Sequence, residues 1–95
     1  MTINMNNVYI LARCLIKNYK GDYSEAPSNY AETFTVNISA KTNTGITQIS
    51  DKNFNKFEDA LKFIIEMKSK YDNVIIDNNT SEDFKFELEN IHAAA

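Results

Sequence analysis

AETFTVNISAK, residues 31–41, has the clearest alternation of apolar and polar side chains in the sequence. Successive side chains of a β-strand point to opposite faces of its sheet. One face receives Phe34, Val36, Ile38 and Ala40, and the other receives Thr33, Thr35, Asn37, Ser39 and Lys41. The pattern is typical of an antiparallel sheet that buries one face and leaves the other open.

The stretch NNVYILARCLIKNY, residues 6–19, is predicted to be another strand of this sheet. With a period of two, one face carries Val8, Ile10, Ala12, Cys14 and Ile16, and the other carries Tyr9, Leu11, Arg13, Leu15 and Lys17. Leu, Ala and Arg also tolerate helices, but the β-branched and aromatic residues at its start favour a strand. Arg13 and Cys14 then point to opposite faces, and a thiol buried among apolar side chains is inert. We therefore interpret this pair as ordinary strand sequence and not as a reactive site.

The other elements are predicted from turn residues and periodicity. Residues 17–30 are expected to form a loop, and residues 42–45 a hairpin turn with Gly45 at positive φ. The third strand is GITQIS, residues 45–50, in which Ile46 and Ile49 have opposite parity, so this strand is short, bulged or ends early. The fourth and fifth strands are VIID, residues 74–77, and FKFELENI, residues 84–91.

Residues 55–71, NKFEDALKFIIEMKSKY, are predicted to form the single helix. Asn55 and Glu58 have the spacing of a capping box. An apolar stripe at helical spacing consists of Phe57, Leu61, Ile64 and Tyr71. The predicted fold class is therefore α+β: an antiparallel sheet of about five strands, in the order β-β-β-α-β-β, with one α-helix packed on one face.

The chain has 95 residues and 43% hydrophobic content, which suits one core. Residues 1–92 are predicted to form a single α+β domain, and residues 93–95, AAA, are interpreted as a vector-derived scar. The sequence shows no secretory signal pattern and no apolar stretch of membrane-spanning length. We therefore expect a cytoplasmic protein without a membrane partner.

The residues that most catalytic and metal sites need are scarce. The chain has one cysteine, two glycines and one histidine, His92, next to the presumed scar. This excludes a Cys/His zinc site and a glycine-rich phosphate loop. We accordingly predict no enzyme activity, no catalytic residue, no metal, no cofactor and no small-molecule ligand.

One helix can cover only one face of such a sheet, so the side chains on the other face of the first strand are predicted to bind a partner. These residues are Tyr9, Leu11, Arg13, Leu15 and Lys17. The partner is another protein or a second copy of the chain in a homodimer, held through the first strand, with edge-strand pairing as one geometry. We interpret the chain as a small protein-interaction module: an inhibitor, adaptor or immunity-type protein, whose size and composition fit a phage or other mobile element.

Two alternatives remain. In the first, the loop folds over the open face and buries it with Tyr19, Tyr23 and Tyr30, which would otherwise be further contact residues. In the second, the open face binds nucleic acid. The charge pattern disfavours the second: the net charge is −3, and residues 72–92 carry six acidic side chains and one basic one. A groove-binding protein typically neutralises about 6–10 phosphates.

Overall fold

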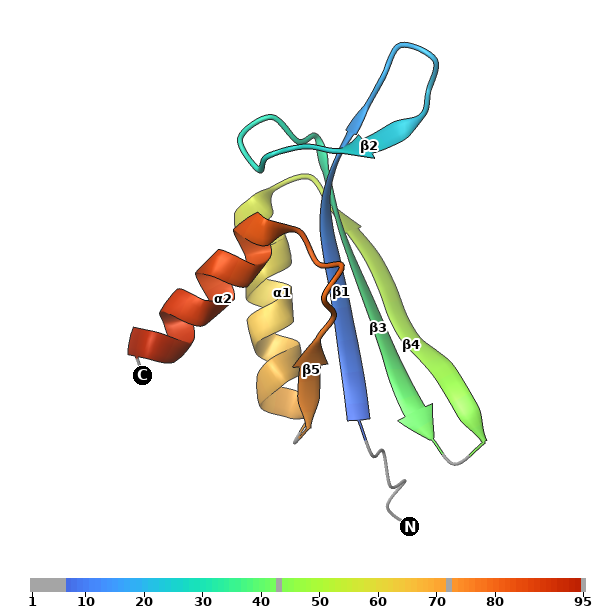
Figure 1. Ribbon diagram of the computed structural model, residues 1–95, viewed down its shortest axis with the longest axis vertical. Helices are drawn as coiled ribbons and strands as arrows, with labels where there is room; N and C mark the ends of the chain where they lie inside the picture. The colour runs from blue at the N-terminus through green and yellow to red at the C-terminus, as the bar shows by residue number, and fades with distance from the viewer. Residues whose placement is uncertain (1–6, 43, 72, 95) are drawn as a thin grey trace.

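The computed structural model describes residues 7–42, 44–71 and 73–94, which form one five-stranded sheet and two helices (Figure 1). The elements in chain order are β1 (Asn7–Lys17), β2 (Tyr23–Glu25), β3 (Thr33–Thr42), β4 (Gly45–Phe54), α1 (Phe57–Lys70), β5 (Val74–Ile76) and α2 (Glu82–Ala94). The predicted α+β class and the five-stranded sheet are confirmed.

Strand β1 lies inside the sheet. Strand β3 pairs with one side of β1, and β5 and β2 pair with successive parts of its other side, while β4 lies beyond β3. Ile10 is opposite Ile38 of β3 and Ile76 of β5. Among the described strands, only the pairing of β5 with β1 is parallel, so the sheet is predominantly antiparallel, as predicted.

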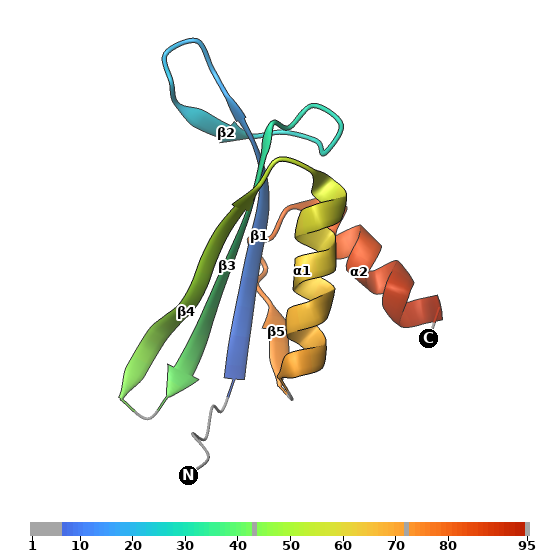
Figure 2. The same ribbon diagram turned by 180° about the vertical axis from the view of Figure 1, so that it is seen from behind.

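Both helices pack on the same face of the sheet, and the alternation of the strands explains which side chains they cover (Figures 1 and 2). The buried apolar side chains of the sheet are Val8, Ile10, Ala12, Cys14, Phe34, Val36, Ile38 and Ala40. The helices contribute Ala60, Phe63, Ile64, Phe84 and Leu88. The Phe84 ring centroid lies 4.6 Å from that of Phe57 on α1 and 6.4 Å from that of Phe34 on β3, so α2 is tied to both layers.

A bulge in β4 accounts for the opposite parity of Ile46 and Ile49. Ile38 pairs with Ser50, but Ser39 pairs with Gln48, so Ile49 is the extra residue. The prediction of a bulged strand is confirmed, whereas a short strand is wrong because β4 continues to Phe54. Gly45 has the predicted positive φ, at 134°; Asn43 in the predicted turn lies outside the described residues.

Helix α1 occurs where it was predicted but begins differently. Its N-cap is Lys56, with no side-chain capping hydrogen bond, so the capping box of Asn55 and Glu58 is wrong. The acidic pair Glu58–Asp59 still occupies the first turn, and Lys68 and Lys70 occupy the last. These charges favour the helix because they oppose the partial charges at its ends.

The C-terminal segment is the main correction to the predicted fold. Residues 84–91 were expected to form a strand but belong to α2, so the molecule has two described helices and the order β-β-β-β-α-β-α. In a helix, residues four apart share a face, while residues two apart point in very different directions. Phe84 and Leu88 are therefore buried together, whereas Phe86, expected in the core, is 62% exposed.

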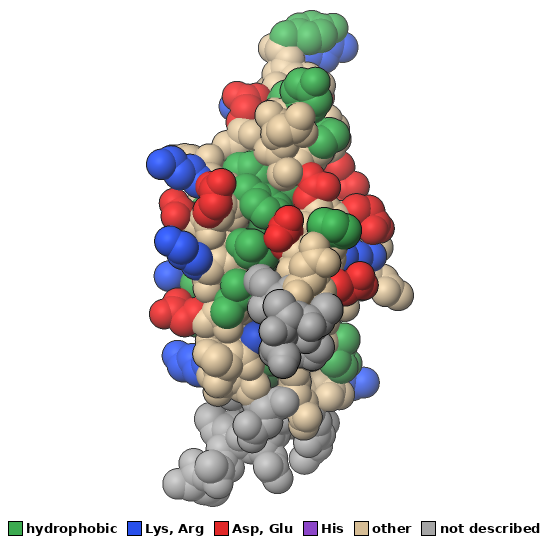
Figure 3. All heavy atoms as spheres, turned by 90° about the vertical axis from the view of Figure 1, so that its left-hand side faces the viewer, with side chains coloured by type: hydrophobic (Ala, Val, Ile, Leu, Met, Phe, Trp, Pro, Cys, Tyr) green, Lys and Arg blue, Asp and Glu red, His purple; other side chains and the backbone are tan. Residues whose placement is uncertain are grey.

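The outer sides of the helices are rich in charge. Figure 3 shows this side of the molecule, where Lys, Arg, Asp and Glu side chains lie on both sides of a band of hydrophobic side chains. The exposed charges of α1 include both signs, while α2 begins with Glu82 and Asp83. Within the described part of the chain, neither helix has the length and apolar character needed to span a membrane.

Candidate protein-binding surface

The sheet face opposite the helices, here called the open face, carries every residue predicted to bind a partner on β1. It is formed by Tyr9, Leu11, Arg13, Leu15 and Lys17 of β1, Thr33, Thr35, Asn37, Ser39 and Lys41 of β3, Ile46, Gln48, Asp51 and Asn53 of β4, and Ile75 of β5. Tyr9, Leu11 and Leu15 are partly buried by their neighbours and are not part of the core. No described helix covers this face (Figures 1 and 2).

The open face has an apolar half and a polar half. Ile75 lies opposite Tyr9, and Leu11 and Leu15 follow on the same face of β1, which forms an apolar strip along one side. Across from this strip, β3 and β4 present mainly hydroxyl and amide side chains, such as Asn37 opposite Leu11. Four charged residues, Arg13, Lys17, Lys41 and Asp51, also lie on this face. Aromatic residues and Arg, such as Tyr9 and Arg13, are enriched at the centre of protein interfaces.

The tyrosine loop does not bury the open face. Tyr19, Tyr23 and Tyr30 are 93%, 55% and 69% exposed, respectively. Residues 17–30, predicted to be only a loop, contain β2, which projects with the preceding turn beyond the rest of the sheet (Figure 1). The first alternative, in which these tyrosines fill the face, is therefore wrong.

Two residues of β2, Tyr23 and Glu25, instead extend the open face sideways, beside the last residues of β1. Tyr23 pairs with Lys17, whose Nζ lies 5.8 Å from the centre of the Tyr23 ring. Glu25 pairs with Leu15, and its Oε1 accepts a hydrogen bond from Nε of Arg13 at 3.1 Å. The predicted contact residue Arg13 is thus held at the surface by an exposed ion pair.

Edge-strand pairing through β1 is excluded because both sides of this strand are occupied. Beyond β5, the N–H of Asp77 donates to the carbonyl oxygen of Ile10 at 2.8 Å, and that of Ser81 donates to the carbonyl oxygen of Ala12 at 2.8 Å. Beyond these, the N–H of Ala26 donates to the carbonyl oxygen of Cys14. A partner can therefore reach β1 only through its side chains.

The side chains of Arg13 and Cys14 lie on opposite sides of the sheet, as predicted. Cys14 is completely buried, and burial, supplemented by the negative charge of Asp83, raises the pKa of its thiol to about 11. The thiol is therefore protonated and inaccessible at neutral pH. His92 lies in α2, but its side chain is outside what the structure describes.

A hollow of about 480 Å³ lies beside β1, next to the open face, and was not predicted. It is lined by Leu11, Arg13, Glu25, Asn78, Asn79, Thr80, Ser81 and Glu82. The parity of the strands could identify Leu11 and Ile75, but residues 78–82 read only as a turn. Nothing local in the sequence indicates that this turn lies against β1.

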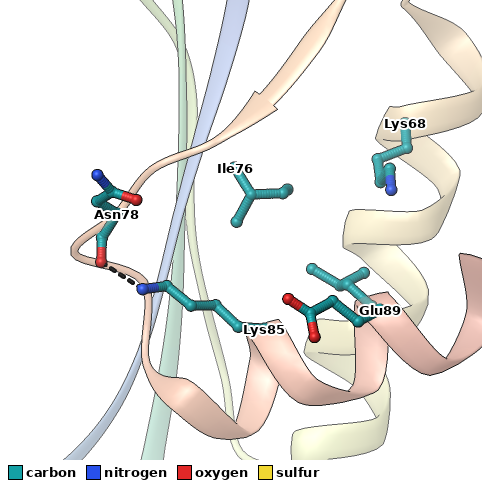
Figure 4. A pocket seen from close by; sticks show the side chains of 6 residues that line it. Lys68, Ile76, Asn78, Lys85 and Glu89 are labelled. Carbon is teal, nitrogen blue, oxygen red and sulfur yellow. Dashed lines mark hydrogen bonds between the residues drawn. The ribbon is translucent and has the colours of Figure 1, made fainter.

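A second hollow, of about 410 Å³, lies between α1, α2 and β5 (Figure 4). Ile76 and Leu88 form its apolar part, and Lys68, Lys85 and Glu89 surround it. Nζ of Lys85 donates to the carbonyl oxygen of Asn78 at 2.6 Å and lies 3.6 Å from Glu82. This lysine therefore helps to hold the turn that lines the first hollow.

The described residues offer groups for noncovalent contacts and no cluster of metal ligands. They contain no group of three or more His, Cys, Asp or Glu residues arranged to hold a metal ion. The open face instead combines apolar, amide, hydroxyl and guanidinium groups suited to noncovalent recognition. Comparisons with protein-family models, curated proteins and solved structures gave no match for this chain.

Proposed function

We propose that this protein is a small, non-enzymatic interaction module, of the inhibitor, adaptor or immunity type, that binds another protein through its open face. The observation that carries the proposal is the apolar strip of Tyr9, Leu11, Leu15 and Ile75, which neither helix covers. We place this encounter in the cytoplasm, where a chain with a single, buried cysteine needs no disulfide.

The dimensions of the open face suit such an interface. Nine residue pairs join β1 to β3, which at ~3.3 Å per residue gives a length of about 30 Å. Four strand positions, from β5 to β4, at ~4.8 Å each give a width of about 20 Å. The resulting area of roughly 600 Å², before side-chain relief is added, approaches the ~800 Å² that one partner buries in a standard interface.

The residue types also fit. Arg and Tyr are enriched among the residues that dominate binding energy, and Arg13 and Tyr9 lie on either side of Leu11 on the same face of β1. The Thr, Asn and Ser side chains of β3 can supply hydrogen bonds around this centre without the desolvation cost of full charges. Leu11 is therefore the position where a charge should harm binding most.

The test is affinity capture from a lysate of the source organism with the wild-type protein and two matched variants. Leu11→Glu places a carboxylate on the open face, while Phe86→Glu places one at an exposed apolar position on α2. We expect the same partner to be retained by wild type and Phe86→Glu and lost with Leu11→Glu. A carboxylate buried without a partner costs at least about 2 kcal/mol, or ~30-fold in affinity.

Two results would contradict the proposal. A partner retained equally by Leu11→Glu, or lost with Phe86→Glu, would place the interface elsewhere. Light scattering on the free protein tests whether the open face binds a second copy of the chain instead. A dimer that Leu11→Glu dissociates would assign the face to that second copy.

A further inference from the structure

The hollow beside β1 exists because no strand lies along the middle of that side of β1. Strand β5 ends at Ile76, opposite Ile10, and the near end of β2 is Glu25, opposite Leu15. Residues 77–81 cross the space between them as a turn. Side-chain hydroxyls satisfy the β1 backbone there: Oγ1 of Thr80 accepts from the N–H of Ala12 at 3.2 Å and Oγ of Ser81 accepts from that of Cys14 at 2.9 Å. A turn supplies no row of outward side chains, so the open face is hollowed at this point.

The wall of this hollow is fixed before any partner arrives. The N–H of Asn79 donates to Oδ1 of Asp77 at 2.8 Å, and the N–H of Thr80 donates to the Asp77 carbonyl oxygen at 3.0 Å. Thr80 is itself buried, and its hydroxyl group donates to the carbonyl oxygen of Ile10. A preformed wall lowers the entropic cost of binding, because the wall need not become ordered when the partner binds.

The hollow presents acidic side chains beside the apolar side chain of Leu11. Two carboxylates, those of Glu25 and Glu82, and one cation, Arg13, line it. Arg13 contacts one oxygen of Glu25, and Nζ of Lys85, which lies outside the lining, is 3.6 Å from one oxygen of Glu82. A third hollow adjoins this one. Asp83 lines it, and Glu25 and Glu82 line both. The charges of Asp83 and Glu25 are felt as far as the buried thiol of Cys14, whose pKa they help to raise.

We propose that this hollow receives a basic side chain, most favourably an arginine, from the protein that binds the open face. The aliphatic part of that side chain packs on Leu11, and its guanidinium donates to the carboxylates of Glu25 and Glu82. Arginine suits this place because its planar group offers five donors and its stem tolerates apolar surroundings. The proposal rests on the proposed function, since Leu11 belongs to both the hollow and the apolar strip.

The direct test is an NMR titration of the ¹⁵N-labelled protein with N-acetyl-argininamide. N-acetyl-citrullinamide, which has nearly the same shape without the charge, is the control. We expect saturable shifts at the amides of Glu25, Asn79, Thr80 and Ser81 with the arginine derivative and much weaker ones with the citrulline derivative. Equal effects of the two probes, or shifts elsewhere only, would overturn the proposal.

Charge variants identify the acceptors. Glu82→Gln should weaken binding of the arginine derivative by about threefold, the effect expected for one exposed charge pair. Glu66→Gln, which removes a carboxylate from the exposed side of α1, is the matched control and should leave the affinity unchanged. Equal loss with both variants would show only nonspecific attraction to an acidic protein and would overturn the proposal.

The two proposals fail in different ways. If Leu11→Glu abolishes partner capture but the arginine derivative does not bind in the hollow, the open face is an interface and the assignment of the basic side chain is wrong. If the arginine derivative binds as expected but Leu11→Glu leaves partner capture intact, the proposed function is wrong. Binding of the probe together with loss of capture supports both.

Discussion

Oγ of Ser81 accepts a hydrogen bond from the backbone N–H of Cys14 at 2.9 Å, so a hydroxyl group stands where a neighbouring strand would supply a carbonyl oxygen. The backbone N–H of Ser81 also donates to the carbonyl oxygen of Ala12. Ser81, the residue before α2, thus bonds to two alternate residues of β1, Ala12 and Cys14. This contact joins the C-terminal helix to the sheet and keeps the middle of β1 from being an unpaired edge.

Ser81→Ala should destabilise the protein because it leaves the N–H of Cys14, in a fully buried residue, without its acceptor. We expect a loss of about 1–3 kcal/mol in the free energy of unfolding, measured by urea denaturation. Ser69→Ala is the control, since the Ser69 hydroxyl donates to the Glu66 carbonyl oxygen on the exposed side of α1. Equal effects of the two substitutions would show that the contact to Cys14 contributes nothing special.

Thr80→Val tests the neighbouring contact with almost no change of shape. Thr80 is 3% exposed, and its hydroxyl group links the N–H of Ala12 to the carbonyl oxygen of Ile10. We expect a loss of about 1–3 kcal/mol, because the N–H of Ala12 loses its acceptor away from water, whereas the carbonyl oxygen of Ile10 keeps the N–H of Asp77 as a donor. Thr47→Val on exposed β4 should change stability by less than about 0.5 kcal/mol. A stable Thr80→Val protein would mean that water or backbone adjustment replaces the hydroxyl group.

Phe84 and Phe86 distinguish the helix from the strand that the alternation predicts. In a strand both rings would lie on one face, and their removal would have similar effects. In α2, Phe84 is buried against Phe34 and Phe57, so Phe84→Ala should cost about 3–5 kcal/mol. Phe86→Ala should cost less than about 1 kcal/mol because the ring is 62% exposed. Thermal or urea unfolding of the two variants gives the comparison, and equal losses would contradict the helical assignment.

The sequence predicts an element correctly where its apolar residues fit only one repeat, either that of a strand or that of a helix. In β3, Phe34, Val36 and Ile38 alternate with Thr and Asn, and no helical face collects those apolar residues, so the strand was predicted correctly. In α2, Phe84 and Leu88 fit either period, and only Phe86 distinguishes them. Residues 74–81 hydrogen-bond to β1 on the side away from β3. This pairing depends on tertiary structure, so no local sequence pattern predicts it.

The candidate surface was likewise predicted where local alternation determines it and missed where tertiary packing does. Alternation alone placed Tyr9, Leu11 and Leu15 on the face away from the core, and they lie there. The hollow beside β1 depends on Asn79 and Ser81 approaching Leu11 from far along the chain. Such an approach follows from packing of the whole molecule, so the sequence identified the strip and missed the hollow.

The thiol of Cys14 should make stability fall at high pH. The pKa of the thiol in the folded protein, about 11, lies above the ordinary value of 9.0 because of burial. Below pH 9 both states hold the proton and the full stability is present; from pH 9 to 11 only the unfolded state releases it. The free energy of unfolding should therefore decrease by about 2 kcal/mol over that range. Denaturation curves of Cys14→Ala, which lacks the thiol, should show a correspondingly smaller decrease, and parallel curves would contradict the account.

Substitutions on the open face should leave the fold intact. Leu11→Glu and Leu15→Asp place charges at positions that keep contact with water, so each should cost no more than about 1 kcal/mol, the span of strand preferences. Ile10→Glu is the matched change on the other face of β1, where the side chain is completely buried, and it should prevent folding. Circular dichroism and urea denaturation of the three variants make the test. Unfolding by Leu11→Glu or Leu15→Asp would mean that these residues are part of the core, and the open face could not then be a binding surface.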